Sequence, residues 1–238
     1  MNPDRMRRTL KTLPRWLVIV IALVILLVLA GGFWFLYFQN QVMQREVERD
    51  LTAIAKLKLD QIAHWRADQI NDAELLAPLV AQLASRYLAE PGAENEGALR
   101  TQLQNLAAQH DYTDVLLVDE EGEIRWGLAP NAEYNREYLP ALETALGSGE
   151  VVFMDLHRGE EIPDAHISVV APLLSGPEPF GALVLISDAD QFLYPLIQSW
   201  PTPSESAETL LVRQEGDQVL FLNDLRHQSG AALDLRLP

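Results

Sequence analysis

The sequence contains no cysteine among its 238 residues, which excludes disulfide bonds and thiolate metal ligands. Its stability must therefore come from packing, and hydrophobic residues make up 48% of the chain, which is enough for a core. Residues 16–38 contain no charged side chain, and residues 39–89 contain no glycine. These two absences mark two segments that differ in kind from the rest of the chain.

Cations are scarce outside the N-terminus. Residues 1–15 hold five of the 18 Lys and Arg residues and a single acid, Asp4. The rest of the chain keeps 13 cations against 33 acids. Because so acidic a surface repels phosphate groups, we predict no nucleic-acid partner.

The uncharged segment, residues 16–38, predicts a transmembrane helix. Its 23 residues are long enough to cross a bilayer, and aromatic residues lie at both ends. The cations of residues 1–15 place that end in the cytoplasm, which puts the main domain in the periplasm or outside the cell. We therefore expect a single-pass protein of the inner membrane. A cleaved signal peptide is the alternative, but its apolar core is shorter, about 7–15 residues.

Residues 39–89 predict one long extracytoplasmic helix. Apolar residues recur at steps of three and four, which indicates a single apolar face. Pro78 is expected to kink this helix or to divide it in two. The apolar face needs a cover, either from the following domain or from a second copy of the chain, and we expect both. If a second copy of the chain covers part of this face, the protein is a homodimer that pairs through the long helix.

The remainder of the chain predicts an α+β fold. Strands are expected at 114–119, 123–127, 151–158, 166–174 and 179–187, with helices at 98–109, 136–147 and 189–199. The segment 113–123 resembles 208–217, with Gly122 and Gly216 lying 94 residues apart. This repeat predicts two antiparallel sheet domains in tandem. The first spans 96–188, a linker spans 189–204, and the second spans 205–238 and is incomplete.

The ordered phrases "LLVDEEGEI", "NREYLPALETALGSG" and "HISVVAPLL" resemble the double Cache sensors, which are tandem PAS-like extracytoplasmic regions of bacterial receptors. Sensor histidine kinases, diguanylate cyclases and chemoreceptors carry such regions. The resemblance implies the ligand-sensing input region of a signal-transduction receptor, as in two-component systems. It implies no catalytic residue, and it implies a cytoplasmic output domain, which this sequence does not contain.

The resemblance also implies a ligand site in the membrane-distal domain, at Arg136, Tyr138 and Asp188. An Arg fork grips a carboxylate with two hydrogen bonds, and an Asp holds an ammonium group. Asn131 and Leu139 depart from the aromatic residues of the family's amino-acid motif. A carboxylate, an amine or another small polar molecule is therefore as good a candidate ligand as an α-amino acid. The alternative is structural, with Arg136 on the surface and Tyr138 in the core.

His157, Arg158 and His166 fall at facing strand ends. His157 and Arg158 are expected to line the mouth of the pocket, with a solvated loop as the alternative, and His157 and His166 are candidate ligand-binding residues. Together with Asp155 they suggest an alternative function, a signal-anchored envelope enzyme. The Asp-x-His spacing is a weak metal signal, so we predict no metal and no cofactor. A membrane-tethered interaction module without a ligand is a third possibility.

Overall fold

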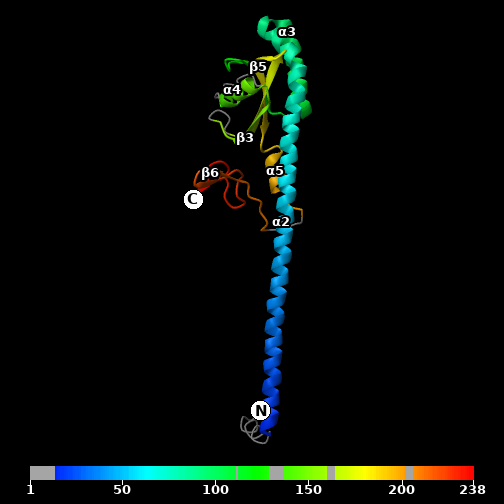
Figure 1. Cartoon of the computed structure of the whole chain (residues 1–238), viewed down its shortest axis with the longest axis vertical. Coiled ribbons are helices and arrows are strands. Elements are labelled where there is room, and N and C mark those ends of the chain that lie inside the picture. The colour runs from blue at the N-terminus through cyan, green and yellow to red at the C-terminus, as the bar shows by residue number, and fades with distance from the viewer. Residues whose placement is uncertain (1–13, 111, 129–136, 160–163, 202–205) are drawn as a thin grey trace. The chain divides into compact units, whose positions relative to one another are not determined.

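The computed structural model describes residues 14–110, 112–128, 137–159, 164–201 and 206–238 (Figure 1). Arg136 and Asn131 lie outside these residues. Contacts within the chain divide it into two units, Met1–Lys56 and Leu57–Pro238. The architecture is α+β, as predicted.

The first unit is formed by the N-terminal part of helix α2, which runs from Arg15 to Ala89. The large apolar side chains between Val18 and Phe38 are exposed in the chain by itself. This segment is long and apolar enough to cross a membrane.

Of the two outcomes expected at Pro78, a kink or a division of the helix, the division does not occur. Helix α2 continues past Pro78 without a break. Proline removes one backbone hydrogen bond, which would normally join residue 78 to the carbonyl of Glu74. Both residues lie on the exposed side of the helix, where water can satisfy that carbonyl. The buried side, which includes Ala77 and Val80, is packed and holds the helix together.

The second unit is built around a five-stranded antiparallel sheet with the order β2-β1-β5-β4-β3. Figure 1 shows α2 and α3 along one face of this sheet and α4 on the other. The elements are α3 (Ala93–His110), β1 (Asp114–Asp119), β2 (Ile124–Gly127), α4 (Leu139–Ser148), β3 (Val152–His157), β4 (His166–Ser175) and β5 (Glu178–Asp188).

Both faces of the sheet are covered, and therefore the middle parts of its central strands are mostly apolar. In β1, Val115 and Leu117 pack on α2 and α3, while Leu116 and Val118 pack against α4. The same alternation holds along β4 and β5. A residue's place in a strand therefore decides whether it faces α2 or α4.

A smaller sheet follows, with α5 (Leu193–Gln198) before it. Its strands are β6 (Val212–Glu215), β7 (Gln218–Phe221) and β8 (Arg236–Leu237). It packs on the larger sheet through a shared apolar cluster that includes Leu220, Leu156 and Ile167.

Lys58 joins helix α2 to the end of α5. Its side chain is 5% exposed, and its ammonium group donates hydrogen bonds to the backbone carbonyls of Leu196 and Ser199. It also donates to the Ser199 hydroxyl at 2.7 Å. Burial lowers the pKa of Lys58, a shift that these bonds to the charged form oppose.

The repeated hairpins of the sequence correspond to β1–β2 and β6–β7, and each turns at a glycine with positive φ. Gly122 has φ of 82°, and a Cβ atom there would collide with the side chain of Leu139. Gly216 has φ of 61°, but a Cβ there would meet nothing within 4 Å. Gly122 is therefore required by packing as well as by its backbone conformation.

We predict that Gly122→Ala destabilises the protein more than Gly216→Ala, measured as thermal unfolding of the full chain in detergent. Both substitutions cost about 1–2 kcal/mol because an L-residue is strained at positive φ. Gly122→Ala adds about 1–3 kcal/mol because the methyl group overpacks the contact with α4. Equal losses in the two variants would contradict the packing role of Gly122.

Candidate functional site

The structure brings His157 and His166 together at the end of β3 and the start of β4. The two residues are cross-strand partners, and their ring centroids are 4.2 Å apart at an angle of 61°. His166 is buried, whereas His157 is half-buried. The prediction that these two histidines lie at facing strand ends agrees with this register.

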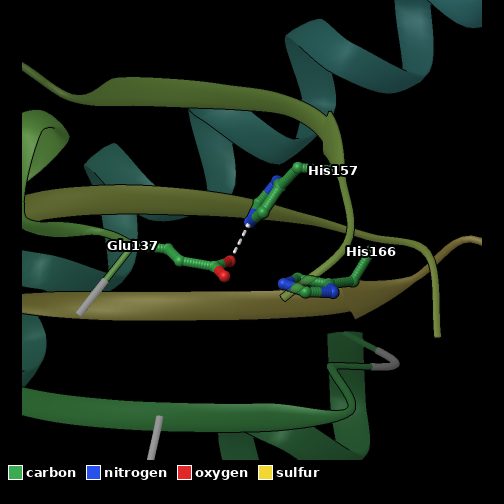
Figure 2. Close-up of side chains that lie close together, drawn as sticks. All are labelled: Glu137, His157 and His166. Atoms are coloured by element: carbon green, nitrogen blue, oxygen red, sulfur yellow. Dashed lines mark ion pairs between the residues drawn. The ribbon is translucent and has the colours of Figure 1, made fainter. Parts of the chain in front are cut away.

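The acid beside the two histidines is Glu137, which the sequence analysis did not single out. It lies just before α4, and its Oε2 is 3.7 Å from Nε2 of His157. Figure 2 shows the Glu137, His157 and His166 side chains pointing toward one another. One ligand atom from each residue lies within 4.8 Å of the others. We call these three residues the His–Glu cluster.

Asp155, the acid expected to accompany the histidines, points elsewhere. Its Oδ2 lies 3.3 Å from the Arg213 guanidinium, and its Oδ1 accepts the backbone N–H of Leu156 at 2.8 Å. A β-bulge between Met154 and His157 interrupts the alternation of β3. Asp155 is therefore outside the cluster, although it lies two residues from His157 and lines a cavity together with it.

Backbone carbonyls set the tautomer of both histidines. Nδ1 of His157 lies 2.8 Å from the Asp155 carbonyl, and Nδ1 of His166 lies 2.9 Å from the Asp164 carbonyl. A carbonyl only accepts, so each Nδ1 carries the hydrogen in the neutral ring. The Nε2 atoms are then left with lone pairs for a proton or another cation.

The electrostatics of the cluster favour a neutral His166. Burial lowers the pKa of His166, and the nearby His157 lowers it further. The Asp164 carbonyl, Glu137 and Asp188 oppose this shift. Burial has the largest effect, so the pKa of His166 lies below its usual value.

Asp188 lies beside the cluster. It is the cross-strand partner of His166, which places both on the α4 side of the sheet. Its Oδ1 accepts the backbone N–H of Asp190 at 2.8 Å, and the residue, half-exposed at the strand end, also lines a cavity next to α2. Asp188 therefore adds negative charge to the site.

Tyr138 is buried in the core between α4 and the sheet. It is 4% exposed, and its hydroxyl donates a hydrogen bond to the Gly122 carbonyl at 2.9 Å. This placement agrees with the structural alternative of the sequence analysis. Leu139 packs in the same apolar cluster.

Two cavities of the second unit lie next to these residues. One, of about 600 Å³, runs between α4 and β3, and it is lined by Glu137, His157, Met154 and Arg213 among others. The other, of about 930 Å³, lies between α2 and α5 and includes Asp188. Trp65 stacks on Phe192 in its wall, with ring centroids 5.3 Å apart.

No family model and no curated protein matches the chain. Solved structures do match. The ligand-binding domain of the Pseudomonas aeruginosa chemoreceptor PctB, in complex with L-Gln, is 12% identical with a TM-score of 0.52. The match covers 75% of this chain and 68% of that one. The chain has the fold of a receptor sensor domain.

Two further sensor domains match with lower scores. The Campylobacter jejuni chemoreceptor Tlp3, with isoleucine bound, is 13% identical with a TM-score of 0.48 over 63% of this chain and 61% of that one. The Vibrio cholerae histidine kinase DctB is 14% identical with a TM-score of 0.48, over 66% and 61% of the two chains. The chain thus spans about three fifths of these sensor domains. The predicted fold of a sensor domain agrees with the match to the PctB ligand-binding domain.

We predict that Tyr138 acts through stability. Tyr138→Phe is expected to lower the free energy of unfolding by about 1–2 kcal/mol, since the buried Gly122 carbonyl loses its donor. Tyr112 supplies the control because its buried hydroxyl has no hydrogen-bond partner among the residues that the structure describes. Tyr112→Phe should be neutral or stabilising. Thermal unfolding of both variants tests this, and an unchanged Tyr138→Phe variant would contradict the role.

Proposed function

We propose that this chain is the extracytoplasmic ligand-sensing input region of a bacterial membrane receptor. The observation that carries the proposal is the fold shared with the PctB ligand-binding domain. The apolar segment of α2 supports it, because a sensor outside the cell needs a membrane-spanning connection to the cytoplasm. The cations of residues 1–15 support a cytoplasmic N-terminus by the positive-inside rule.

The ligand site that we propose is the cavity between α4 and β3. Its volume of about 600 Å³ falls within the range of small-molecule pockets. Met154 and Phe153 supply apolar wall, while Glu137 and His157 supply polar groups. Glu137, with Asp188 nearby, favours a ligand that carries a positive charge, such as an amine or an amino acid. PctB was solved with L-Gln, so amino acids come first among the compounds to test.

The membrane receptor that we propose is a homodimer that pairs through α2. In the first unit, Val47 and Leu51 are each 51% exposed, and Ile54 follows after three more residues. Steps of four and three place these side chains along one helix face, which is the pattern of a two-stranded coiled coil. Pairing with a second copy would bury this face.

Ligand binding is tested by thermal unfolding of the full chain in nanodiscs with EDTA, against amino acids, amines and small carboxylates. A ligand at 100 times its Kd stabilises by about 2.7 kcal/mol, which corresponds to a rise in Tm of roughly 5–10 °C. Met154→Trp fills the proposed cavity and should abolish the rise. Gln191→Trp fills the cavity beside α2 and should leave it unchanged.

Two outcomes would contradict this proposal. A rise that survives Met154→Trp but is lost in Gln191→Trp would assign the ligand to the cavity beside α2. Metal-dependent turnover that is lost in His166→Ala would overturn the sensor function in favour of an enzyme.

Orientation and pairing are tested together with single cysteines, because the natural chain has none to interfere. Leu51→Cys is expected to react with a membrane-impermeant maleimide on intact cells and to form a disulfide-linked dimer on oxidation. Arg49→Cys faces the opposite side of the helix, since two residues turn the chain by about 200°. It should be labelled without forming the dimer.

Labelling only after the cells are permeabilised would refute the orientation. Equal cross-linking at positions 49 and 51 would refute pairing through the predicted face.

A further inference from the structure

We propose that the His–Glu cluster (Glu137, His157 and His166) is a binding site for a divalent transition metal ion of the zinc type. This inference depends on the proposed function in one respect, which is that the ion is the sensed ligand or a part of the ligand site. The metal site itself follows from the geometry of the three side chains.

Three separate elements converge to make the site. Glu137 precedes α4, His157 ends β3 and His166 begins β4. Two imidazoles and one carboxylate form a common zinc ligand set, with a fourth position left for water or a bound molecule. Figure 2 shows the three side chains directed at a common point from different sides.

The hydrogen bonds of the two imidazoles prepare them as ligands. Both Nδ1 atoms bond to backbone carbonyls, at 2.8 Å in His157 and 2.9 Å in His166. Histidines that hold metals typically donate their second ring N–H in this way, which fixes the tautomer and the ring orientation. The Nε2 atom of His157 then faces the Glu137 carboxylate at 3.7 Å. A proton or a metal ion held between this lone pair and the carboxylate would turn their repulsion into attraction.

The cation next to His157 in the chain is bonded elsewhere. Arg158 follows His157 in the chain, but its guanidinium bonds to Asp234 at 2.8 Å and to the Ala232 carbonyl at 3.1 Å. Asp188 adds a further negative charge near His166. A divalent cation at the cluster would therefore be attracted by Asp188 as well as by Glu137.

Gly159 leaves space for the carboxylate. A Cβ atom at this position would lie 3.0 Å from Oε1 and 3.1 Å from Oε2 of Glu137. A side chain here would push the carboxylate away from its present place.

The type of metal follows from the ligands. Imidazole nitrogen suits zinc and its neighbours in the transition series, whereas magnesium and calcium prefer oxygen ligands throughout. Zinc bonds to nitrogen are about 2.0 Å long, so the ligand atoms of a tetrahedral site lie about 3.3 Å apart. The present atoms lie within 4.8 Å of one another. Binding would therefore draw β3, β4 and the start of α4 together by about 1 Å.

The test uses the full chain in detergent, stripped with EDTA and then titrated with zinc by calorimetry in buffer that lacks chelator. We expect one zinc ion per chain, with two imidazole ligands in the zinc X-ray absorption spectrum. His157→Ala and Glu137→Gln should each weaken binding by about 100-fold or more, since loss of even an outer partner costs 10–100-fold. His157 and Glu137 are partly exposed, so both variants are expected to fold, with circular dichroism as the check.

Matched controls come from a histidine and an acid outside the cluster. His64→Ala and Asp155→Asn should bind zinc as the natural chain does. The proposal is overturned by the absence of saturable binding, by unchanged affinity in His157→Ala and Glu137→Gln, or by equal loss in His64→Ala. The ligand screen described above contains EDTA, so a response there would leave the sensor proposal standing even if zinc does not bind.

Discussion

The packing of one face of α2 against the sheet is the constraint on which the second unit depends. Ala73, Ala77, Val80 and Ala84 are almost wholly buried, and these small side chains let the helix backbone lie close to the strands. Without this contact, one face of β1, β4 and β5 would expose a continuous apolar surface to water. The same contact explains why Pro78 is tolerated, because packing on the buried side replaces the support of the missing backbone hydrogen bond.

Polar contacts fix the position of α2 along the sheet, which apolar packing alone does not fix. Apolar surfaces alone permit a helix to slide, whereas a buried hydrogen bond holds only at one position. Gln69 of α2 accepts a hydrogen bond from the Ser187 hydroxyl at 3.3 Å, and both residues are buried. Lys58 holds the end of α5 in the same manner. The position of α2 along the sheet is therefore tied to the strand ends that carry the His–Glu cluster.

Much of the fold and two of the three cluster residues, His157 and His166, could be predicted from the sequence, but the acid that completes the cluster could not. The strand at 114–119 was predicted because its apolar run and the glycine turn are local signals. Glu137 was missed because only the fold brings it to His157 and His166, which lie 20 and 29 residues further along the chain. Asp155 was expected beside His157 on the assumption of regular alternation. The bulge in β3, which depends on pairing with β4, could not be read from spacing.

Side chains alternate between the two faces of each strand, so the strands that carry the site also contact α2. His166 faces the cluster, whereas the next residue, Ile167, packs in the apolar cluster that Trp65 of α2 joins. On the neighbouring strand, Asp188 lies on the site side and Ser187 bonds to Gln69 of α2. Protein interiors are close-packed and compress little, so a strand end that moves at one face must also move at the other. A contraction of about 1 Å at a zinc site of the usual dimensions would thus reach α2 through two adjacent residue pairs, without any separate transmitting element.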